Sequence, residues 1–110
     1  MTKVTFYQNR NGRITGFEAR DHSGYAEAGE DIVCAAVSAL VIHTVNSLDR
    51  FTKDSVKEFS DPENAVISVR VKGTPSDGAE LLLQALASTL SDMQEEESYR
   101  DFIDVNFVEV

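Results

Sequence analysis

The character of the sequence changes abruptly within one stretch, Asp21-His-Ser-Gly-Tyr-Ala-Glu-Ala-Gly-Glu-Asp-Ile-Val-Cys-Ala-Ala-Val-Ser38. The rest of the chain is arranged around this stretch. Its first half is punctuated by glycine, whereas its second half opens an apolar segment of helical length and content. The sequence therefore predicts a connection over residues 21–29 and a helix over about residues 30–48. The same stretch contains the one cysteine of the chain, Cys34, and one of its two histidines, His22.

Two strands are predicted before this stretch, over residues 3–9 and 13–20, because both alternate polar and apolar side chains. Asn11-Gly12 lies between them and suits a two-residue primed hairpin turn, since both residue types tolerate positive φ. Such a turn would place Phe6 opposite Phe17 on the core face.

The second half of the chain predicts further strands and a second helix. Residues 56–59 are a weak strand candidate, residues 65–72 a stronger one, and residues 103–107 alternate as a closing strand. Between them, Thr74-Pro-Ser-Asp77 supplies a helix start, and leucines follow at helical spacing. We expect one α+β domain over residues 1–110, with a largely antiparallel sheet of about four to five strands and two helices packed on one face.

Composition limits the classes of function. The formal charge of −9 argues against tight binding to a phosphate backbone, so we expect no direct contact with nucleic acid. The first residues lack a signal-peptide pattern, and we see no apolar run that approaches the roughly 20 residues of a membrane span. These features predict a cytoplasmic protein that does not bind membranes. A single cysteine also excludes a multi-cysteine zinc site, and we expect no metal or cofactor.

The middle of the first predicted helix, residues 32–42, is apolar nearly all round. A helix of this kind is usually buried on most sides. One sheet in a chain of 110 residues has difficulty covering both faces of such a helix. A homodimer is therefore a reasonable hypothesis.

Cys34 is the first candidate for chemistry. We expect it about one turn into the helix, where unpaired backbone N–H groups and the positive end of the dipole would favour a thiolate. The same N–H groups could stabilise an oxyanion during acyl transfer. The alternative is a cysteine that packs as a small apolar core residue. His22, at the end of the second predicted strand, could exchange the proton of the thiol, or it could be a solvated residue of the connection.

Three other polar residues accompany Cys34 on the predicted helix. Asp31 and Ser38 lie three residues before it and four after it, which places all three on one helix face. Asp31 could orient an imidazolium or be an ordinary acid of a first helical turn, and Ser38 could hydrogen-bond the thiol or merely permit close packing. His43 lies about 13 Å along the helix from Cys34, too far for a direct hydrogen bond, and is expected to be structural or exposed.

The residues around His22 and Cys34 resemble the signature of a known protein family. His22-Ser-Gly-Tyr-Ala, Gly29, Asp31-Ile-Val-Cys-Ala-Ala-Val-Ser-Ala-Leu40 and Thr44-Val-Asn resemble the signature of the ribosomal-processing cysteine proteases, Prp. The family commonly has glycine where this chain has Asp21. The resemblance implies a cytosolic, dimeric cysteine endopeptidase that removes an N-terminal extension from the large-subunit ribosomal protein bL27, with a catalytic histidine and cysteine that match His22 and Cys34.

The resemblance also gives the glycine-bearing connection a role. It would gate the substrate, because its glycines permit movement and it joins the two catalytic residues. The residues of this predicted gating loop are Ser23, Gly24, Tyr25, Ala26, Glu27, Ala28, Gly29 and Glu30. Two hypotheses from other classes stand beside the protease: a non-catalytic ribosome-associated binding module in which Cys34 is a core residue, and a redox sensor, which lacks a resolving cysteine within the chain.

Overall fold

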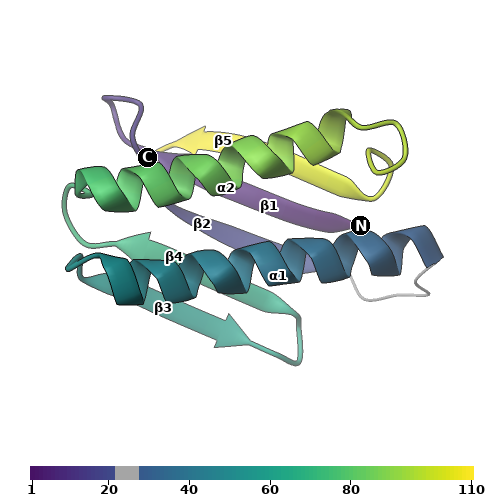
Figure 1. Cartoon of the computed structure of the whole chain (residues 1–110), viewed down its shortest axis with the longest axis horizontal. Helices are drawn as coiled ribbons and strands as arrows, with labels where there is room; N and C mark the ends of the chain where they lie inside the picture. The colour runs from purple at the N-terminus through teal and green to yellow at the C-terminus, as the bar shows by residue number, and fades with distance from the viewer. Residues whose placement is uncertain (22–27) are drawn as a thin grey trace.

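The fold is one mixed sheet with both helices on the same face. The computed structural model describes residues 1–21 and 28–110. The sheet has five strands in the order β3-β4-β2-β1-β5, and all neighbouring pairs are antiparallel except β1 with β5. Figure 1 shows α1 and α2 side by side in front of this sheet. The prediction of an α+β domain with a largely antiparallel sheet is confirmed.

The boundaries of the elements lie close to those that the sequence predicts. In chain order the elements are β1 (Thr2–Gln8), β2 (Ile14–Asp21), α1 (Ala28–Phe51), β3 (Val56–Asp61), β4 (Val66–Val71), α2 (Asp77–Glu95) and β5 (Ile103–Glu109).

The first hairpin has the predicted register over most of its length but not the predicted turn. Phe6 lies opposite Phe17, and the register then shifts by one residue between Tyr7 and Gln8. The backbone N–H of Asn9 donates to the carbonyl of Arg13, so three residues form the loop, and the two-residue turn is wrong. Only Gly12 among them has a positive φ, of 79°. A three-residue loop that ends in a left-handed glycine with a bulge is the next commonest hairpin connection.

The core lies between the sheet and the two helices, and the rings of Phe6 and Phe17 belong to it. Phe6 and Phe17 are fully buried, with their ring centroids 6.1 Å apart. Phe107 of β5 stacks on Phe6 at 5.4 Å. From α2 the buried residues are Ala79, Leu83, Leu86, Ala87 and Leu90. This amphipathic helix therefore packs on the sheet along one stripe, as its leucine spacing predicts.

Within the part of the chain that the structure describes, helix α1 is buried on one side, which agrees with the expectation that one sheet has difficulty covering both faces of such a helix. The buried residues of α1 are Val33, Val37, Val41, Thr44, Ser47 and Leu48. On the opposite side Ile32 and Ile42 are 62% and 51% exposed. Both helices pack on the same face of the sheet, so the outer side of α1 stays exposed among the residues that the structure describes.

By length and composition α1 also meets the requirements of a membrane span. The segment Asp31–Phe51 covers 21 residues, so our expectation that no apolar run approaches such a length is wrong. A third of its most apolar window, 33%, is buried within the domain. A core helix of the same length satisfies the same test, and the buried face of α1 packs as a core helix does.

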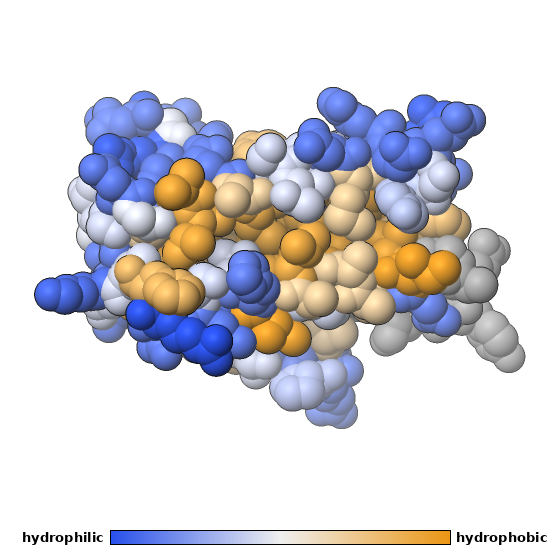
Figure 2. All heavy atoms as spheres, in the orientation of Figure 1, coloured by the Kyte–Doolittle hydropathy of each residue, from blue (hydrophilic) through white to orange (hydrophobic). Residues whose placement is uncertain are grey.

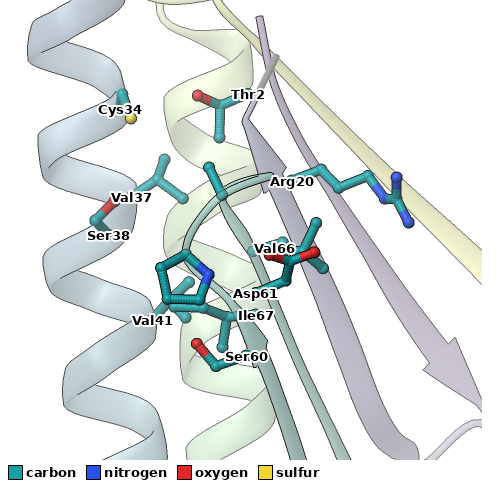
Figure 3. Close-up of a pocket in the computed structure, with 13 residues that line it drawn as sticks. Thr2, Arg20, Cys34, Val37, Ser38, Val41, Ser60, Asp61, Val66 and Ile67 are labelled. Atoms are coloured by element: carbon teal, nitrogen blue, oxygen red, sulfur yellow. The ribbon is translucent and has the colours of Figure 1, made fainter. Parts of the chain in front are cut away.

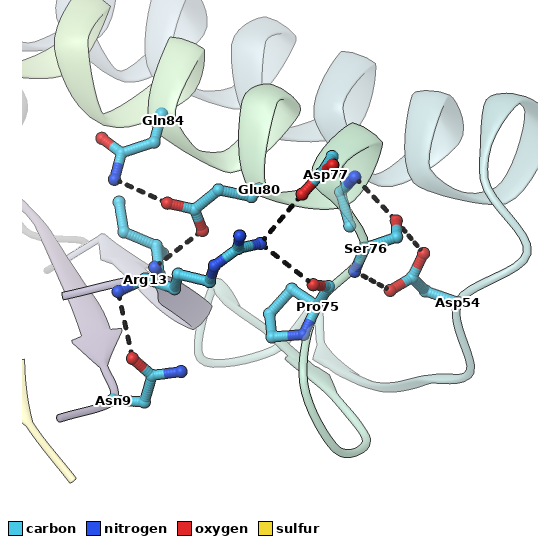
Figure 4. A network of polar contacts seen from close by, with 10 residues as sticks. Asn9, Arg13, Asp54, Pro75, Ser76, Asp77, Glu80 and Gln84 are labelled. Carbon is cyan, nitrogen blue, oxygen red and sulfur yellow. Dashed lines mark hydrogen bonds and ion pairs between the residues drawn. The ribbon is translucent and has the colours of Figure 1, made fainter. Parts of the chain in front are cut away.

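Polar contacts fix the start of α2 against the loops around it (Figure 4). Ser76 is the N-cap, and its hydroxyl accepts a hydrogen bond from the backbone N–H of Ala79 at 3.1 Å. The Ser76 hydroxyl and backbone N–H both donate to the carboxylate of Asp54. These bonds hold the pKa of Asp54 below its ordinary value, and the bond from the Ser76 hydroxyl has the largest effect. Arg13 reaches Asp77 at 3.2 Å, which ties the first hairpin to the same helix end.

Candidate active site

Cys34 lies on α1 six residues after the first helical residue, Ala28. The helix begins earlier than the sequence predicts, so Cys34 is about 9 Å along the axis, and the expectation of about one turn is wrong. The unpaired N–H groups of a helix belong to its first turn, and Cys34 lies beyond them. Its side chain is half-buried and is therefore not one of the fully buried core residues.

Cys34 forms part of the wall of a pocket of about 230 Å³ between α1 and the strands (Figure 3). The pocket is lined by Thr2, Ala19, Arg20, Cys34, Val37, Ser38, Val41, Ser60, Asp61, Pro62, Ala65, Val66 and Ile67. In Figure 3 Cys34 and Val37 lie on the side of α1 that faces Thr2 at the start of β1. A thiol in the wall of a pocket can meet a bound ligand, which a core cysteine cannot.

His22, the predicted partner of Cys34, comes directly after a strand that lines this pocket. Ala19 and Arg20 of β2 line it, and β2 ends at Asp21, which pairs with Thr2 in extended backbone. His22 is the next residue in the sequence and lies outside the described residues. The pairing of His22 with Cys34 stays a prediction, and the described residues show only that the strand preceding His22 lines the pocket that contains Cys34.

The predicted gating loop is divided between described and undescribed residues. Its members Ser23, Gly24, Tyr25, Ala26 and Glu27 lie outside the described residues. Ala28, Gly29 and Glu30 belong to α1, so placing them in a loop is wrong. One glycine does not prevent a helix from starting, since its cost of about 1 kcal/mol is small beside the tertiary packing of a 24-residue helix.

The other predicted site residues lie at different places on α1. Ser38 lines the pocket together with Cys34, although it is exposed. Asp31 is exposed and does not line the pocket. His43 is exposed, as predicted. Of the three residues, Ser38 is therefore the one that the structure brings to the same pocket as Cys34.

The wall of the pocket opposite α1 was not predicted from the sequence. The strands β3 and β4 meet there in a turn, and residues 60–67 supply six of the thirteen residues that line the pocket. Asp61-Pro-Glu-Asn64 is recognisable in the sequence as a turn, but nothing local in it indicates which helix it faces. That proximity arises only when β4 pairs with β2 in the middle of the sheet.

A half-buried cysteine in the wall of a pocket, on a helix that packs against a sheet, has the accessibility that the nucleophile of a thiol enzyme requires. The sequence profile of the family described as cysteine protease Prp matches residues 1–104. The chain therefore belongs to the family of ribosomal processing cysteine proteases, Prp, and is a peptidase.

Individual relatives agree with this family. The ribosomal processing cysteine protease Prp of Staphylococcus aureus strain Mu50 is 30% identical over 107 residues, which are 97% of this chain and 99% of the relative. That of Bacillus subtilis strain 168 is 38% identical over 48 residues, which are 44% of this chain and 43% of the relative.

A solved structure extends the similarity to three dimensions. A crystal structure of the essential Prp of S. aureus with a substrate peptide superposes with a TM-score of 0.90 at 29% identity, covering 98% of this chain and 100% of that one. A second S. aureus Prp structure, with a covalently linked product peptide, has a TM-score of 0.85.

Proposed function

We propose that this peptidase cleaves peptides with Cys34 as its nucleophile and His22 as its general acid and base. One observation carries the proposal: a cysteine protease needs a thiol, and Cys34 is the only thiol in the sequence. Its place in a pocket wall supports this role, because a nucleophile must meet the substrate. The position of His22 directly after β2 supports its pairing with Cys34.

The reaction then follows from the two groups. His22 accepts the proton of the Cys34 thiol while the sulfur attacks the carbonyl carbon of the peptide bond. The C–N bond breaks, His22 returns the proton to the departing amine, and a thioester remains on Cys34. Water then attacks the thioester, with His22 accepting its proton, and the carboxylic acid leaves as the thiol of Cys34 re-forms.

We also propose that the substrate is the N-terminal extension of ribosomal protein bL27. The names of the relatives support this proposal in part, since the S. aureus protein is a ribosomal processing protease whose structures hold a substrate peptide and a covalently linked product peptide. A substrate that is part of the ribosome implies a cytoplasmic enzyme.

The substrate is tested with two synthetic peptides. The first spans the junction between the extension and the mature bL27 sequence, and the second contains the same residues in scrambled order. We expect mass spectrometry to detect one pair of products from the first peptide, at the junction, and none from the second. Equal cleavage of both peptides would contradict the assignment of the substrate while leaving the peptidase activity intact.

We propose, finally, that the enzyme is a homodimer in which α1 of one chain packs on α1 of a second copy. Four exposed apolar residues recur along the outer side of this helix: Ile32, Ala35, Ala39 and Ile42. Figure 2 shows hydrophobic residues gathered along the helix-bearing face of the molecule. Small residues in the middle of such a stripe allow two helices to approach closely, and covering the stripe would remove apolar surface from water.

Replacing Ile42 by glutamate is expected to convert the dimer to a monomer, because a charge buried in an apolar interface has no partner. Phe59→Glu is the matched control, since Phe59 is 57% exposed but lies on β3 rather than on α1. Sedimentation equilibrium measures both variants beside the unmodified protein. A monomeric unmodified protein at micromolar concentration, or equal effects of the two substitutions, would rule out this interface.

A further inference from the structure

The pocket beside Cys34 is walled on two sides by different parts of the fold (Figure 3). One wall is α1, where Val37 and Val41 are 2% and 1% exposed. The other wall is the β3–β4 turn with the start of β4, where Val66 is 5% exposed. The buried part of the pocket is thus formed by aliphatic side chains, and the charged side chains Arg20 and Asp61 are the two among its lining residues that carry a formal charge.

The size and chemistry of the pocket fit one apolar side chain. Its volume of about 230 Å³ lies below the roughly 300–1,000 Å³ of sites that enclose drug-sized ligands. An apolar side chain that enters it leaves water and gains contact with Val37 and Val41. A charged side chain would lose its hydration among aliphatic groups at a considerable cost in free energy.

The turn that forms the outer wall is fixed by its own hydrogen bonds. The side-chain amide of Asn64 donates to the carboxylate of Asp61 at 2.7 Å, and its backbone N–H donates to the same carboxylate at 3.3 Å. These two bonds hold the pKa of Asp61 below its ordinary value, and the bond from the side-chain amide has the larger effect. Pro62 restricts the backbone, and its carbonyl accepts from Ala65, whose φ of 51° is left-handed.

We propose that the β3–β4 turn, residues 60–65, determines the specificity of this peptidase, by forming the wall of a pocket that takes one apolar side chain next to the scissile bond. Asn64 is a positioning residue, because its bonds to Asp61 hold the turn in place before the substrate arrives. A wall that is already ordered does not lose conformational freedom when the peptide binds. This inference rests on the proposed role of Cys34, since the pocket is a subsite only because the nucleophile forms part of its wall.

The test compares kcat/KM for a series of peptides in which each of the four residues around the cleaved bond is changed in turn to Ala, Val, Leu, Phe or Glu. At one of these positions we expect kcat/KM to rise by about 10-fold per buried methylene. Glutamate at that position should be the poorest substrate.

Ser60→Phe places a large side chain among the residues that line the pocket, at an exposed position of β3 where the fold should tolerate it. We expect this variant to lower kcat/KM by about 10-fold or more for the Leu and Phe peptides and to leave the Ala peptide within about twofold. Ser60→Ala is the matched control and should keep the preference of the unmodified enzyme. An equal effect of Ser60→Phe on all peptides would overturn the inference.

Asn64→Ala tests the positioning role. Loss of its bonds to Asp61 should raise KM for the preferred peptide several-fold and leave kcat unchanged, because the chemistry at Cys34 is not touched. Glu63→Ala, in the same turn, should change neither constant. A fall in kcat with constant KM would overturn the role of Asn64.

Failure of this inference differs from failure of the proposed function. If the unmodified enzyme cleaves all peptides at similar rates and Cys34→Ala cleaves none, the catalytic assignment stands and the specificity pocket is wrong. If the unmodified enzyme and Cys34→Ala cleave the peptides equally, the proposed nucleophile is wrong, and the inference falls with it.

Discussion

Cys34→Ala is expected to lower kcat/KM for peptide cleavage by roughly 10⁴-fold or more, because removal of a covalent nucleophile leaves only binding and positioning to accelerate hydrolysis. The free energy of unfolding should change by no more than about 1 kcal/mol, since the side chain is half-buried and alanine is slightly smaller. Mass spectrometry of the products and a urea titration measure the two quantities separately. Cleavage that survives this substitution would rule out Cys34 as the nucleophile.

The two histidines supply a matched pair for the same experiment. His22→Ala should remove most of the activity and change its dependence on pH, because the proton of the thiol loses its acceptor. His43→Ala should keep the activity, since His43 is exposed on α1 about 13 Å along the axis from Cys34. Equal losses in the two variants would argue against a specific role for His22.

Phe6→Ala is expected to have the largest effect on stability, a loss of about 3–5 kcal/mol from the free energy of unfolding. The side chain of Phe6 is fully buried and contacts the rings of Phe17 and Phe107, so its removal leaves a cavity where three strands meet. Domains of this size are stable by only about 5–15 kcal/mol, and the variant should be close to unfolding at physiological temperature.

Urea denaturation followed by circular dichroism measures this effect. The midpoint should fall while the slope of the transition stays the same, since the surface exposed on unfolding hardly changes. Phe59→Ala provides the control, because Phe59 is 57% exposed on the edge strand β3 and its removal should change the free energy of unfolding by about 0.5 kcal/mol or less. Similar losses in both variants would mean that Phe6 contributes no more to stability than an exposed phenylalanine does.

The pattern of side chains predicted the elements of this fold better than their connections. The pairing of Phe6 with Phe17 was predicted correctly, because the register shift after Tyr7 offsets the extra residue of the loop, and the leucine spacing of the second helix identified its buried stripe. The turn at Asn11-Gly12 was predicted one residue too short, because two-residue and three-residue hairpin loops share the same preference for asparagine and glycine. The first helix was predicted to begin at Glu30 rather than Ala28, since glycine at 29 resembles a loop signal.

The family and the candidate nucleophile could be predicted from the sequence, whereas the residues that form the pocket could not. The sequence has one cysteine, and it lies in a recognisable motif, so the candidate nucleophile is identified without knowledge of any long-range contact. The wall opposite Cys34 comes from residues 60–67, more than twenty positions later in the chain.

By itself, then, the sequence determined the family, the class of fold and the thiol, because motif, periodicity and residue count are local properties of the chain. Only the tertiary structure decided which turn faces Cys34 and which side of α1 remains exposed. Both depend on the order of strands in the sheet, which places β4 beside β2 and leaves the helices one face to cover. That order is set by the free energy of burying the whole core, to which distant segments contribute together.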